Sequence, residues 1–295
     1  MTSTPVLEAR PDVGAPRKRG GRRRSSRSAS RTLNATSGLG LGVAMIWFSL
    51  LVLIPLTAIV VKASGGGWHT YEHTLSNSQT LDAIKLTVGM SVLVTLLNMV
   101  MGTIIAWVLV RDRFPGKALL DLVIDIPFAL PTIVAGLVLL SLYGADSPIG
   151  LHLANTRAAV FLAIAFVTLP FVVRTVQPVL EEMETDVEDA AASLGASRAV
   201  TFRRIVLPTL VPAIFAGASL SFARGISEYG SLVLLSGNLP HRTEVTSVRV
   251  MSYLEGGDTA AAASVATVLL VVALLAIVAL DVTARRVAKR DVARG

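Results

Sequence analysis

Long apolar runs constrain this chain more than any other feature. Several are near or above the roughly 20 residues that a helix needs to cross a bilayer core of about 30 Å. Within hydrocarbon every backbone N–H and C=O needs an internal partner, so runs without alternating polarity predict α-helices and not barrel strands. We therefore expect an all-α, polytopic membrane protein. The six transmembrane helices are predicted at about 40–62, 84–110, 118–142, 157–179, 206–235 and 259–282.

The basic residues fall into four groups that share one side of the membrane if there are six spans. The positive-inside rule assigns this side to the cytosol, so both termini are predicted to be cytoplasmic. The opposite loops, at about 63–83, 143–156 and 236–258, hold fewer basic residues and leave room for an extracytoplasmic partner. The four groups are the N-terminal tail, the loop with Arg111, Arg113 and Lys117, the loop with Arg198, Arg203 and Arg204, and the end with Arg285, Arg286, Lys289, Arg290 and Arg294.

Both ends of the chain are basic and polar. Nine of the 27 Lys and Arg residues precede residue 32, in a stretch rich in Arg, Ser and Gly that cannot bury a core. We expect residues 1–37 to be a disordered cytoplasmic tail that contacts anionic lipid, so the charge of +7 does not indicate a nucleic-acid partner. Residues 38–284 are expected to form the six-helix domain, and residues 285–295 a second basic cytoplasmic tail.

A hydrophilic segment at about 181–204 interrupts the apolar runs. Its acidic residues come first and its basic residues last, which is the order that a helix dipole favours. Alanines give it a high helix propensity, and Gly195 permits a turn. We expect one or two short helices along the membrane surface. Their small-residue face suits a groove on another protein, and an ordinary interfacial helix is the alternative.

Charges and prolines stand inside two of the spans. Arg224 and Glu228 are four residues apart and are expected to share a helix face, where an isolated charge costs several kcal/mol. They predict one of two roles. Either Arg224 binds an anion and Glu228 partly neutralises its charge, so that binding stays weak enough for release, or the two form an ion pair that holds helices together. After Asp125, Pro127 and Pro131 each remove a backbone donor, so a kink or break is expected near 127–131, either lining a pore or serving packing alone.

Other polar groups predict no site. Pro170 and Pro178, with Arg174 between them, indicate the end of a helix. His69 and His73 have the spacing of one helix face, but no third ligand is evident and three preceding glycines indicate a loop, so no metal is expected. The chain has no cysteine, which excludes disulfides and Cys-based metal sites.

The hydrophilic segment resembles the signature E-A-A-x3-G-x9-I-x-L-P of permease subunits of ATP-binding-cassette (ABC) importers. In that family the segment is the coupling helix, seated in a cleft of the ATPase subunit, and the resemblance implies this role here. One departure is Asp189 in place of the usual glutamate, with Glu188 one residue earlier. The residues assigned to coupling are Glu188, Asp189, Ala190, Ala191, Gly195, Ile205, Leu207 and Pro208.

Further motifs between about residues 38 and 282 resemble the sulfate and thiosulfate importer permeases, among them Asp125 to Pro131, Leu169 to Glu182 and Arg224 to Gly230. The resemblance is closest to the T-type partner of two related permeases, in which a tyrosine follows the glutamate. It implies a type I ABC importer permease fold (MetI-like). The residues expected on the substrate pathway are Arg224, Glu228, Tyr229, Gly230, Ser231, Asp125, Pro127 and Pro131.

This resemblance implies half of a pore in the plasma membrane of a prokaryote, moving sulfate or thiosulfate inward. The implied partners are a second related permease, two ABC ATPase subunits and an extracytoplasmic sulfate-binding protein. The chain is not expected to be an enzyme or to bind a cofactor, because Gly116-Lys117 is followed by Ala118 and lacks the upstream glycine of a phosphate loop. ATP and Mg²⁺ are expected to be used by the ATPase.

Three alternatives remain at this stage. Molybdate or tungstate permeases share the Arg-x3-Glu-aromatic-Gly element, so this element alone does not identify the anion. An ion-coupled secondary transporter predicts inverted repeats, and no internal repeat of fixed period is visible. A non-transporting scaffold would leave Arg224 and Glu228 unexplained.

Overall fold

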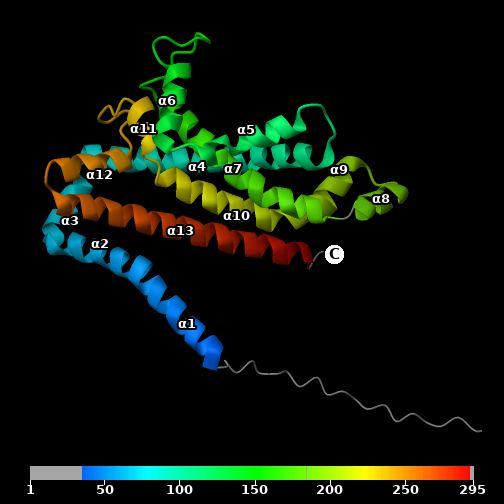
Figure 1. Cartoon of the computed structure of the whole chain (residues 1–295), viewed down its shortest axis with the longest axis horizontal. Coiled ribbons are helices and arrows are strands. Elements are labelled where there is room, and N and C mark those ends of the chain that lie inside the picture. Colours follow the sequence, from blue (N-terminus) through cyan, green and yellow to red (C-terminus); the bar gives the residue numbers. More distant parts are fainter. Residues whose placement is uncertain (1–34, 184, 293–295) are drawn as a thin grey trace, which may run out of the picture. The chain divides into compact units, whose positions relative to one another are not determined.

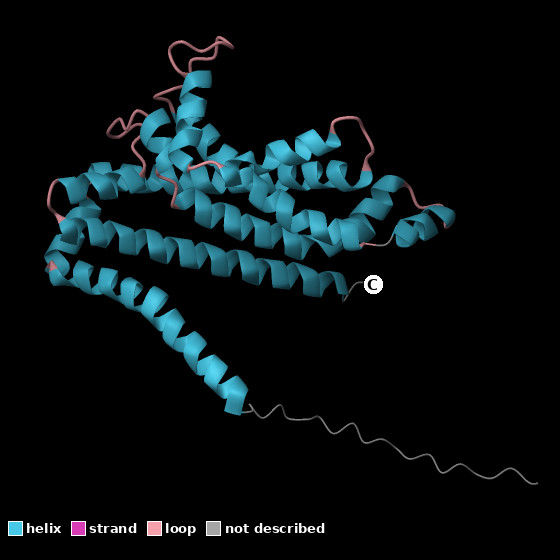
Figure 2. Ribbon diagram, in the orientation of Figure 1, coloured by secondary structure: helices cyan, strands magenta, loops and turns pink. Residues whose placement is uncertain are grey.

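The computed structural model describes residues 35–183 and 185–292, and within these ranges every regular element is a helix (Figure 2). This confirms the all-α prediction. The chain divides into two units, Met1–Leu50 and Leu51–Gly295. The elements are α1 (Ala35–Phe48), the π-helical η1 (Ser49–Leu53), α2 (Ile54–Gly65), α3 (Gly67–Ser76), α4 (Ser78–Arg111), α5 (Lys117–Ala129), α6 (Thr132–Tyr143), α7 (Arg157–Glu182), α8 (Thr185–Ser193), α9 (Arg198–Thr201), the π-helical η2 (Phe202–Val206), α10 (Leu207–Ile226), α11 (Gly230–Leu235), α12 (Thr246–Glu255) and α13 (Thr259–Val292).

Five helical stretches are long and apolar enough to cross a membrane, and α5 with α6 supplies a sixth if this pair counts as one span. The pair is bent by 118°. The predicted break near 127–131 is confirmed, because α5 ends at Ala129 and Pro131 occupies the N-cap position of α6. The five stretches are Leu39–Gly65, Ser78–Arg111, Arg157–Glu182, Arg198–Ile226 and Thr259–Val287.

The predicted span 206–235 was wrong in its second half. Instead of one helix, α10 ends at Ile226 and a separate α11 begins at Gly230. Glu228 provides the physical reason: its Oε1 accepts hydrogen bonds from the backbone N–H and from Oγ of Ser231, both at 2.9 Å. This side chain satisfies a free N–H in the first turn of α11 and thereby stabilises a new helix start.

The ends of the chain also differ from the prediction. Helix α13 continues to Val292 instead of ending near 282, because no glycine or proline interrupts it. An ion pair between Asp281 and Arg285 at 2.9 Å supports this extension. Most of the predicted tail 1–37 lies outside the described residues, but Ala35–Ser37 already belong to α1.

The glycine-rich stretch before His69 was predicted as a loop, and this was wrong. Gly66 and Gly67, the latter at φ +74°, form only a tight junction, and α3 follows directly. His69 and His73 lie on this helix with stacked rings, whose centroids are 6.4 Å apart. Among the residues that the structure describes, no three His, Asp or Glu side chains come together in a way that could hold a metal.

The centre of the larger unit consists of α4, α7 and α10, which lie side by side, with α13 next to α10 (Figure 1). One apolar cluster fills this centre towards α12 and another towards α8. Between the clusters, Asn98 Nδ2 donates to Thr168 Oγ1 at 2.8 Å and to Ser221 Oγ at 3.1 Å, and all three residues are buried. Such bonds join helices where apolar surface alone gives no driving force.

Helices α6 and α11 approach each other closely through small residues. A Cβ built on Gly136 would lie 2.7 Å from Cα of Ser231, so only glycine fits at this crossing. On the other side, Gly230 lies against Thr132 and Ile133, directly after Pro131. The start of α11 is therefore held beside the break between α5 and α6.

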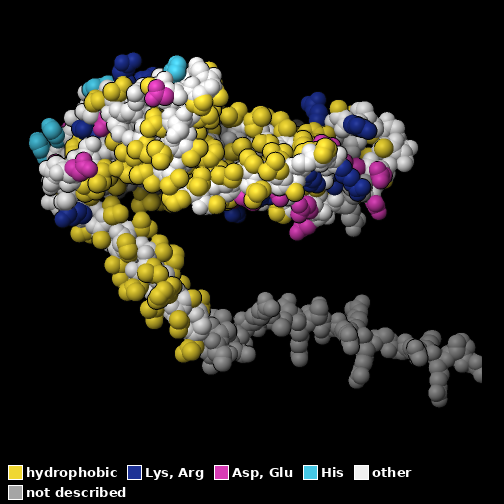
Figure 3. Space-filling view, turned by 45° about the horizontal axis from the view of Figure 1, so that its top comes forward, with side chains coloured by type: hydrophobic (Ala, Val, Ile, Leu, Met, Phe, Trp, Pro, Cys, Tyr) yellow, Lys and Arg dark blue, Asp and Glu magenta, His cyan; other side chains and the backbone are white. Residues whose placement is uncertain are grey.

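The surface suits a protein of the membrane. Many exposed side chains on α2, α4, α5, α6 and α13 are large and apolar, more than an aqueous surface normally carries. On the face shown in Figure 3, apolar side chains form a continuous band, while charged side chains gather at the two ends of the band, one of which is where α8 and α9 lie. We call this the α8 end and the opposite end, with α3 and α12, the α12 end.

Candidate functional site

The hydrophilic segment forms a helix–turn–helix of α8 and α9. The turn follows the Schellman pattern: Gly195 N–H donates to Ala192 C=O at 2.9 Å, and Ala196 N–H donates to Ala191 C=O at 3.0 Å. Gly195 has φ +81°, a conformation that other residues adopt at a cost. The spacing between the pair Ala190-Ala191 and Gly195 therefore places the glycine at the position where the helix ends and the chain turns. The expected one or two short helices are present.

The second half of the motif joins this segment to the bundle. Ile205 lies in η2, and Leu207 and Pro208 begin α10. Leu207 N–H donates to Phe202 C=O, five residues back, and Pro208 has no N–H to offer to the preceding turn. The motif thus marks a widened turn through which α9 continues into α10.

The helix–turn–helix presents apolar side chains to its surroundings. Leu194, at the tip of the turn, is 89% exposed, and Val187 and Val200 are exposed as well. Asp189 and Ala190 are also exposed, while Glu188 and Ala191 are partly buried. Exposed apolar side chains on a charged segment are typical of a protein contact. The sequence prediction missed Leu194, because a single leucine after an alanine-rich helix carries no periodic signal.

Glu188 is bound within the chain. Its Oε1 accepts a hydrogen bond from Arg111 Nη2 at 2.7 Å, in an ion pair between α8 and the last residue of α4. The side chains are only 16% and 23% exposed for Arg111 and Glu188, respectively. The sequence had suggested Arg111 only as part of the positive side, because its partner lies 77 residues away.

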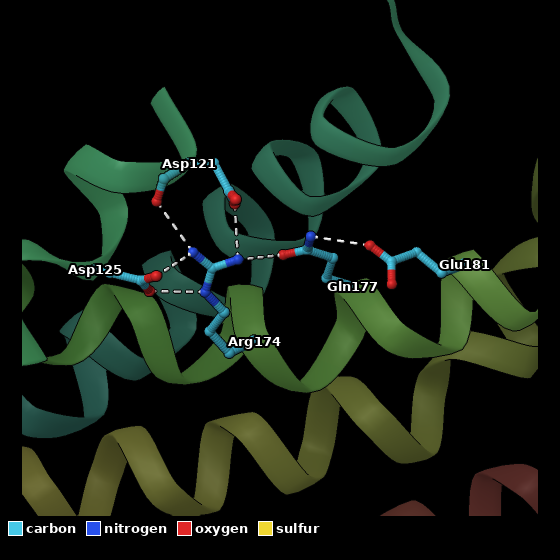
Figure 4. A network of polar contacts seen from close by, with 5 residues as sticks. All are labelled: Asp121, Asp125, Arg174, Gln177 and Glu181. Atoms are coloured by element: carbon cyan, nitrogen blue, oxygen red, sulfur yellow. Dashed lines mark hydrogen bonds and ion pairs between the residues drawn. The ribbon is translucent and has the colours of Figure 1, made fainter. Parts of the chain in front are cut away.

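Arg174 lies at the centre of a polar network, so its interpretation as part of a helix end was wrong (Figure 4). Both prolines around it lie inside α7, which continues to Glu182 because packing against α4 and α10 supports it. The guanidinium binds Asp125 twice, at 2.8 and 2.7 Å, and Asp121 at 2.8 Å. It also donates to Gln177 Oε1 at 2.6 Å and to the carbonyl of Asp121 at 3.0 Å.

These contacts use all the donors of Arg174. A guanidinium has five N–H groups, and each of them here meets an oxygen. Arg174 thus faces two carboxylates, and Gln177 extends the network to a third, Glu181, at 3.0 Å. Arg174 therefore fixes α5 to α7 and has no donor left for an additional anion.

Arg224 and Glu228 form an ion pair, with Nη2 and Oε2 2.6 Å apart. Arg224 lies in the last turn of α10, and Glu228 lies beyond the helix, in the connection to α11. The Glu228 side chain is fully buried, whereas that of Arg224 is 30% exposed. Glu228 thus has a structural role in stabilising the start of α11 through Ser231, and the exposed partner is the arginine.

The predicted pathway residues form two groups. Tyr229 is exposed, and Gly230 and Ser231 are buried in the first turn of α11, next to Arg224 and Glu228. Pro131 lies close to this group, because α6 and α11 meet there. Asp125 and Pro127 lie on α5 in a separate group, where Asp125 is engaged by Arg174.

The helices are apolar and of membrane-spanning length, and a helix–turn–helix is exposed at one end, which defines a helical membrane protein. The chain belongs to the family described as "Binding-protein-dependent transport system inner membrane component", whose model matches residues 98–290. This agrees with the predicted ABC importer permease class.

Individual relatives agree with this assignment. The chain is 41% identical over 261 residues to the sulfate transport system permease protein CysT of Salmonella typhimurium, covering 86% of this chain and 94% of that protein. It is 38% identical over 263 residues to a probable sulfate transport system permease protein of Nephroselmis olivacea, covering 87% and 93%. These relatives do not favour the molybdate alternative.

Solved structures show the same fold. A bacterial alginate ABC transporter, in complex with an alginate-bound periplasmic protein, contains a chain that matches with a TM-score of 0.72 at 18% identity, covering 85% of this chain and 94% of that one. The MetNI methionine ABC transporter matches with a TM-score of 0.56 at 18% identity, covering 70% and 95%. At these identities the likeness concerns the fold alone, and it confirms the predicted MetI-like class.

Proposed function

We propose that this chain is a permease subunit of an ABC importer that forms half of a pore for sulfate. The second half would be a related permease. Two separate ATPase subunits would use ATP and Mg²⁺, and an extracytoplasmic sulfate-binding protein would deliver the anion. The helix–turn–helix carries this proposal, because Leu194 projects from its tip with no cover from the described residues. The sulfate permeases among the relatives support sulfate as the cargo.

The proposal places the α8 end in the cytosol. Arg111, Arg113, Lys117, Arg203 and Arg204 lie on the segments at this end, as the positive-inside rule requires. With six crossings, both termini are then cytoplasmic, and α3 and α12 face the binding protein. Closure of the ATPase subunits on ATP would displace α8 and shift the bundle between inward-open and outward-open states.

Arg224 is the group that we assign to the anion. Within the described residues its guanidinium pairs only with Glu228, through Nη2, so other N–H groups remain for a tetrahedral oxyanion. Partial neutralisation by Glu228 keeps such binding weak enough for release. Tyr229 is exposed beside it, and Gly230, Ser231 and Pro131 shape the wall, whereas Pro127 lies apart on α5. Asp125 is held by Arg174 and does not contact the anion.

Uptake of labelled sulfate by cells that carry the whole transport operon tests the cargo. We expect saturable uptake against which molybdate competes weakly. Replacement of Arg224 by Gln is expected to lower uptake about tenfold, and replacement by Lys to lower it less, since the positive charge remains. Strong competition by molybdate at low concentration would instead identify molybdate as the cargo.

Crosslinking tests the partner. Because the chain has no cysteine, Leu194→Cys creates its only thiol. In membranes that contain the full transporter, we expect a short thiol crosslinker at this position to capture an ATPase subunit. The matched control is Leu239→Cys, which is also exposed but precedes α12, at the other end, and should not capture the ATPase. Capture of the ATPase from position 239, or its absence at position 194, contradicts the proposal.

A further inference from the structure

Helix α8 is only loosely attached to the bundle. Of the described helices, α9 is the one that packs against it to a substantial extent. A groove of about 760 Å³ separates α8 and α9 from the last turns of α4, and its lining includes Trp107, Asp112 and Arg198. If α8 is to transmit a displacement to the bundle, it needs a rigid contact with one of the bundle helices. Apolar packing does not supply such a contact for α8.

The described residues that flank α8, Met183 before it and Gly195 after it, are also not helical. Met183, which ends α7, has extended backbone angles, φ −75° and ψ 114°. On the other side, Gly195 takes the left-handed conformation, φ +81°. Neither residue continues a helix axis, so a rigid link must come from a side chain.

Arg111 spans the groove and supplies this link. Its Nη2 donates to Glu188 Oε1 of α8 at 2.7 Å and to the carbonyl of Met183 at 3.3 Å. Its guanidinium lies 5.9 Å from the centroid of the Trp107 ring, whose edge-on partner is Phe202 at 5.3 Å. One side chain thus contacts α8 and the end of α7, and reaches η2 through the tryptophan. Because the ion pair is largely shielded from solvent, it is screened less than a surface pair.

Helix α4 leads from this contact to the α12 end. It runs for 34 residues, about 50 Å at 1.5 Å per residue, and contains no proline. Towards its other end it is tied to the segment around α12 by several contacts between side chains, of which three are the shortest. These are Gln79 with Glu244 at 2.6 Å, Thr80 with Tyr253 at 2.9 Å and Asp82 with His241 at 2.8 Å.

We infer that Arg111 is a positioning residue that fixes α8 to α4, so that displacement of α8 moves α4 and, through it, the segment 239–255. This inference rests on the proposed coupling role of α8. The displacement of α8 could already reach the bundle along the chain itself, through α7 on one side and through α9 and α10 on the other. The ion pair with Arg111 adds a third connection, to α4. The same inference assigns Glu188 to the interior of the chain and leaves Asp189, which is exposed, for the ATPase.

The test uses the complete transporter with its binding protein in proteoliposomes. Arg111→Ala is expected to keep the ATPase subunits bound and basal ATP hydrolysis unchanged. Stimulation of hydrolysis by the sulfate-loaded binding protein, and sulfate uptake, should fall about tenfold, while the KM for sulfate changes little. The matched control is Arg113→Ala, which removes a positive charge two residues away where no ion pair is found within the described residues.

Charge exchange separates this role from a merely structural one. Arg111→Glu and Glu188→Arg should each lose stimulation, and the double variant should regain a substantial part of it. The inference is overturned if Arg111→Ala behaves like Arg113→Ala, or if the double variant is no better than the single ones. In either case crosslinking of Leu194→Cys to the ATPase would still occur. Loss of that crosslink in the unmodified background would instead contradict the proposed function.

Discussion

Replacement of Gly195 by valine is expected to reduce ATP-driven sulfate uptake at least tenfold, whereas replacement by asparagine should leave most of it. Gly195 has φ +81° at the C-terminus of α8, where left-handed backbone costs an ordinary L-residue about 1–2 kcal/mol. A β-branched residue tolerates this conformation least, and asparagine tolerates it best among non-glycine residues. Valine therefore opens the turn and misplaces Leu194.

The backbone alone accounts for this expected difference. A Cβ built on Gly195 meets no atom of the described chain within 4 Å, so neither substitution causes a clash inside the permease. Uptake and binding-protein-stimulated ATP hydrolysis should both be measured, with the amount of inserted protein as the control. Equal losses for valine and asparagine would indicate that the space around the glycine in the complex matters, and not its backbone angle.

Removal of Arg174 is expected to have the second large effect. Arg174→Ala leaves Asp121 and Asp125 without their cation. Breaking a buried pair costs about 3–5 kcal/mol, and because these aspartates are half exposed we expect about 2 kcal/mol. The midpoint of thermal inactivation of the transporter should fall by about 5 °C, and sulfate uptake by about tenfold.

Two further variants define the mechanism of this loss. Arg174→Lys should be intermediate, because an ammonium keeps the charge but has three donors where the guanidinium has five. Combining Arg174→Ala with Asp121→Asn and Asp125→Asn should recover most of the thermal stability, since no uncompensated aspartate remains. An unchanged midpoint in Arg174→Ala would show that the network does not stabilise the α5–α7 pair.

The coupling segment could be predicted from sequence because its signals are local. Gly195 and Pro208 act through their backbone conformations. Gly195 ends α8, and Pro208 stands in the first turn of α10. The break after α5 was predictable for the same reason, since Pro127 and Pro131 lack donors wherever they stand. The end of α10 at Ile226 was not, because Gly225 lies inside the helix and the group that stabilises the start of α11 is a glutamate within an apolar stretch.

The long-range contacts could not be predicted in this way. Arg174 meets Asp121 across 53 residues, and Arg111 meets Glu188 across 77. Charge patterning located each arginine but gave no sign of which carboxylate would face it. The sequence therefore pointed to Arg224 as the notable membrane arginine, and the equally important one on α7 was assigned to a helix end.

The hydrogen bonds of Asn98 limit how the bundle rearranges. They join α4, α7 and α10 at a single level between the two apolar clusters. Axial sliding of any of these helices would break a hydrogen bond between buried groups, which is costly, whereas tilting about this level preserves both bonds. The level of Asn98 is therefore a fulcrum, and opening at one end of the three helices accompanies closing at the other.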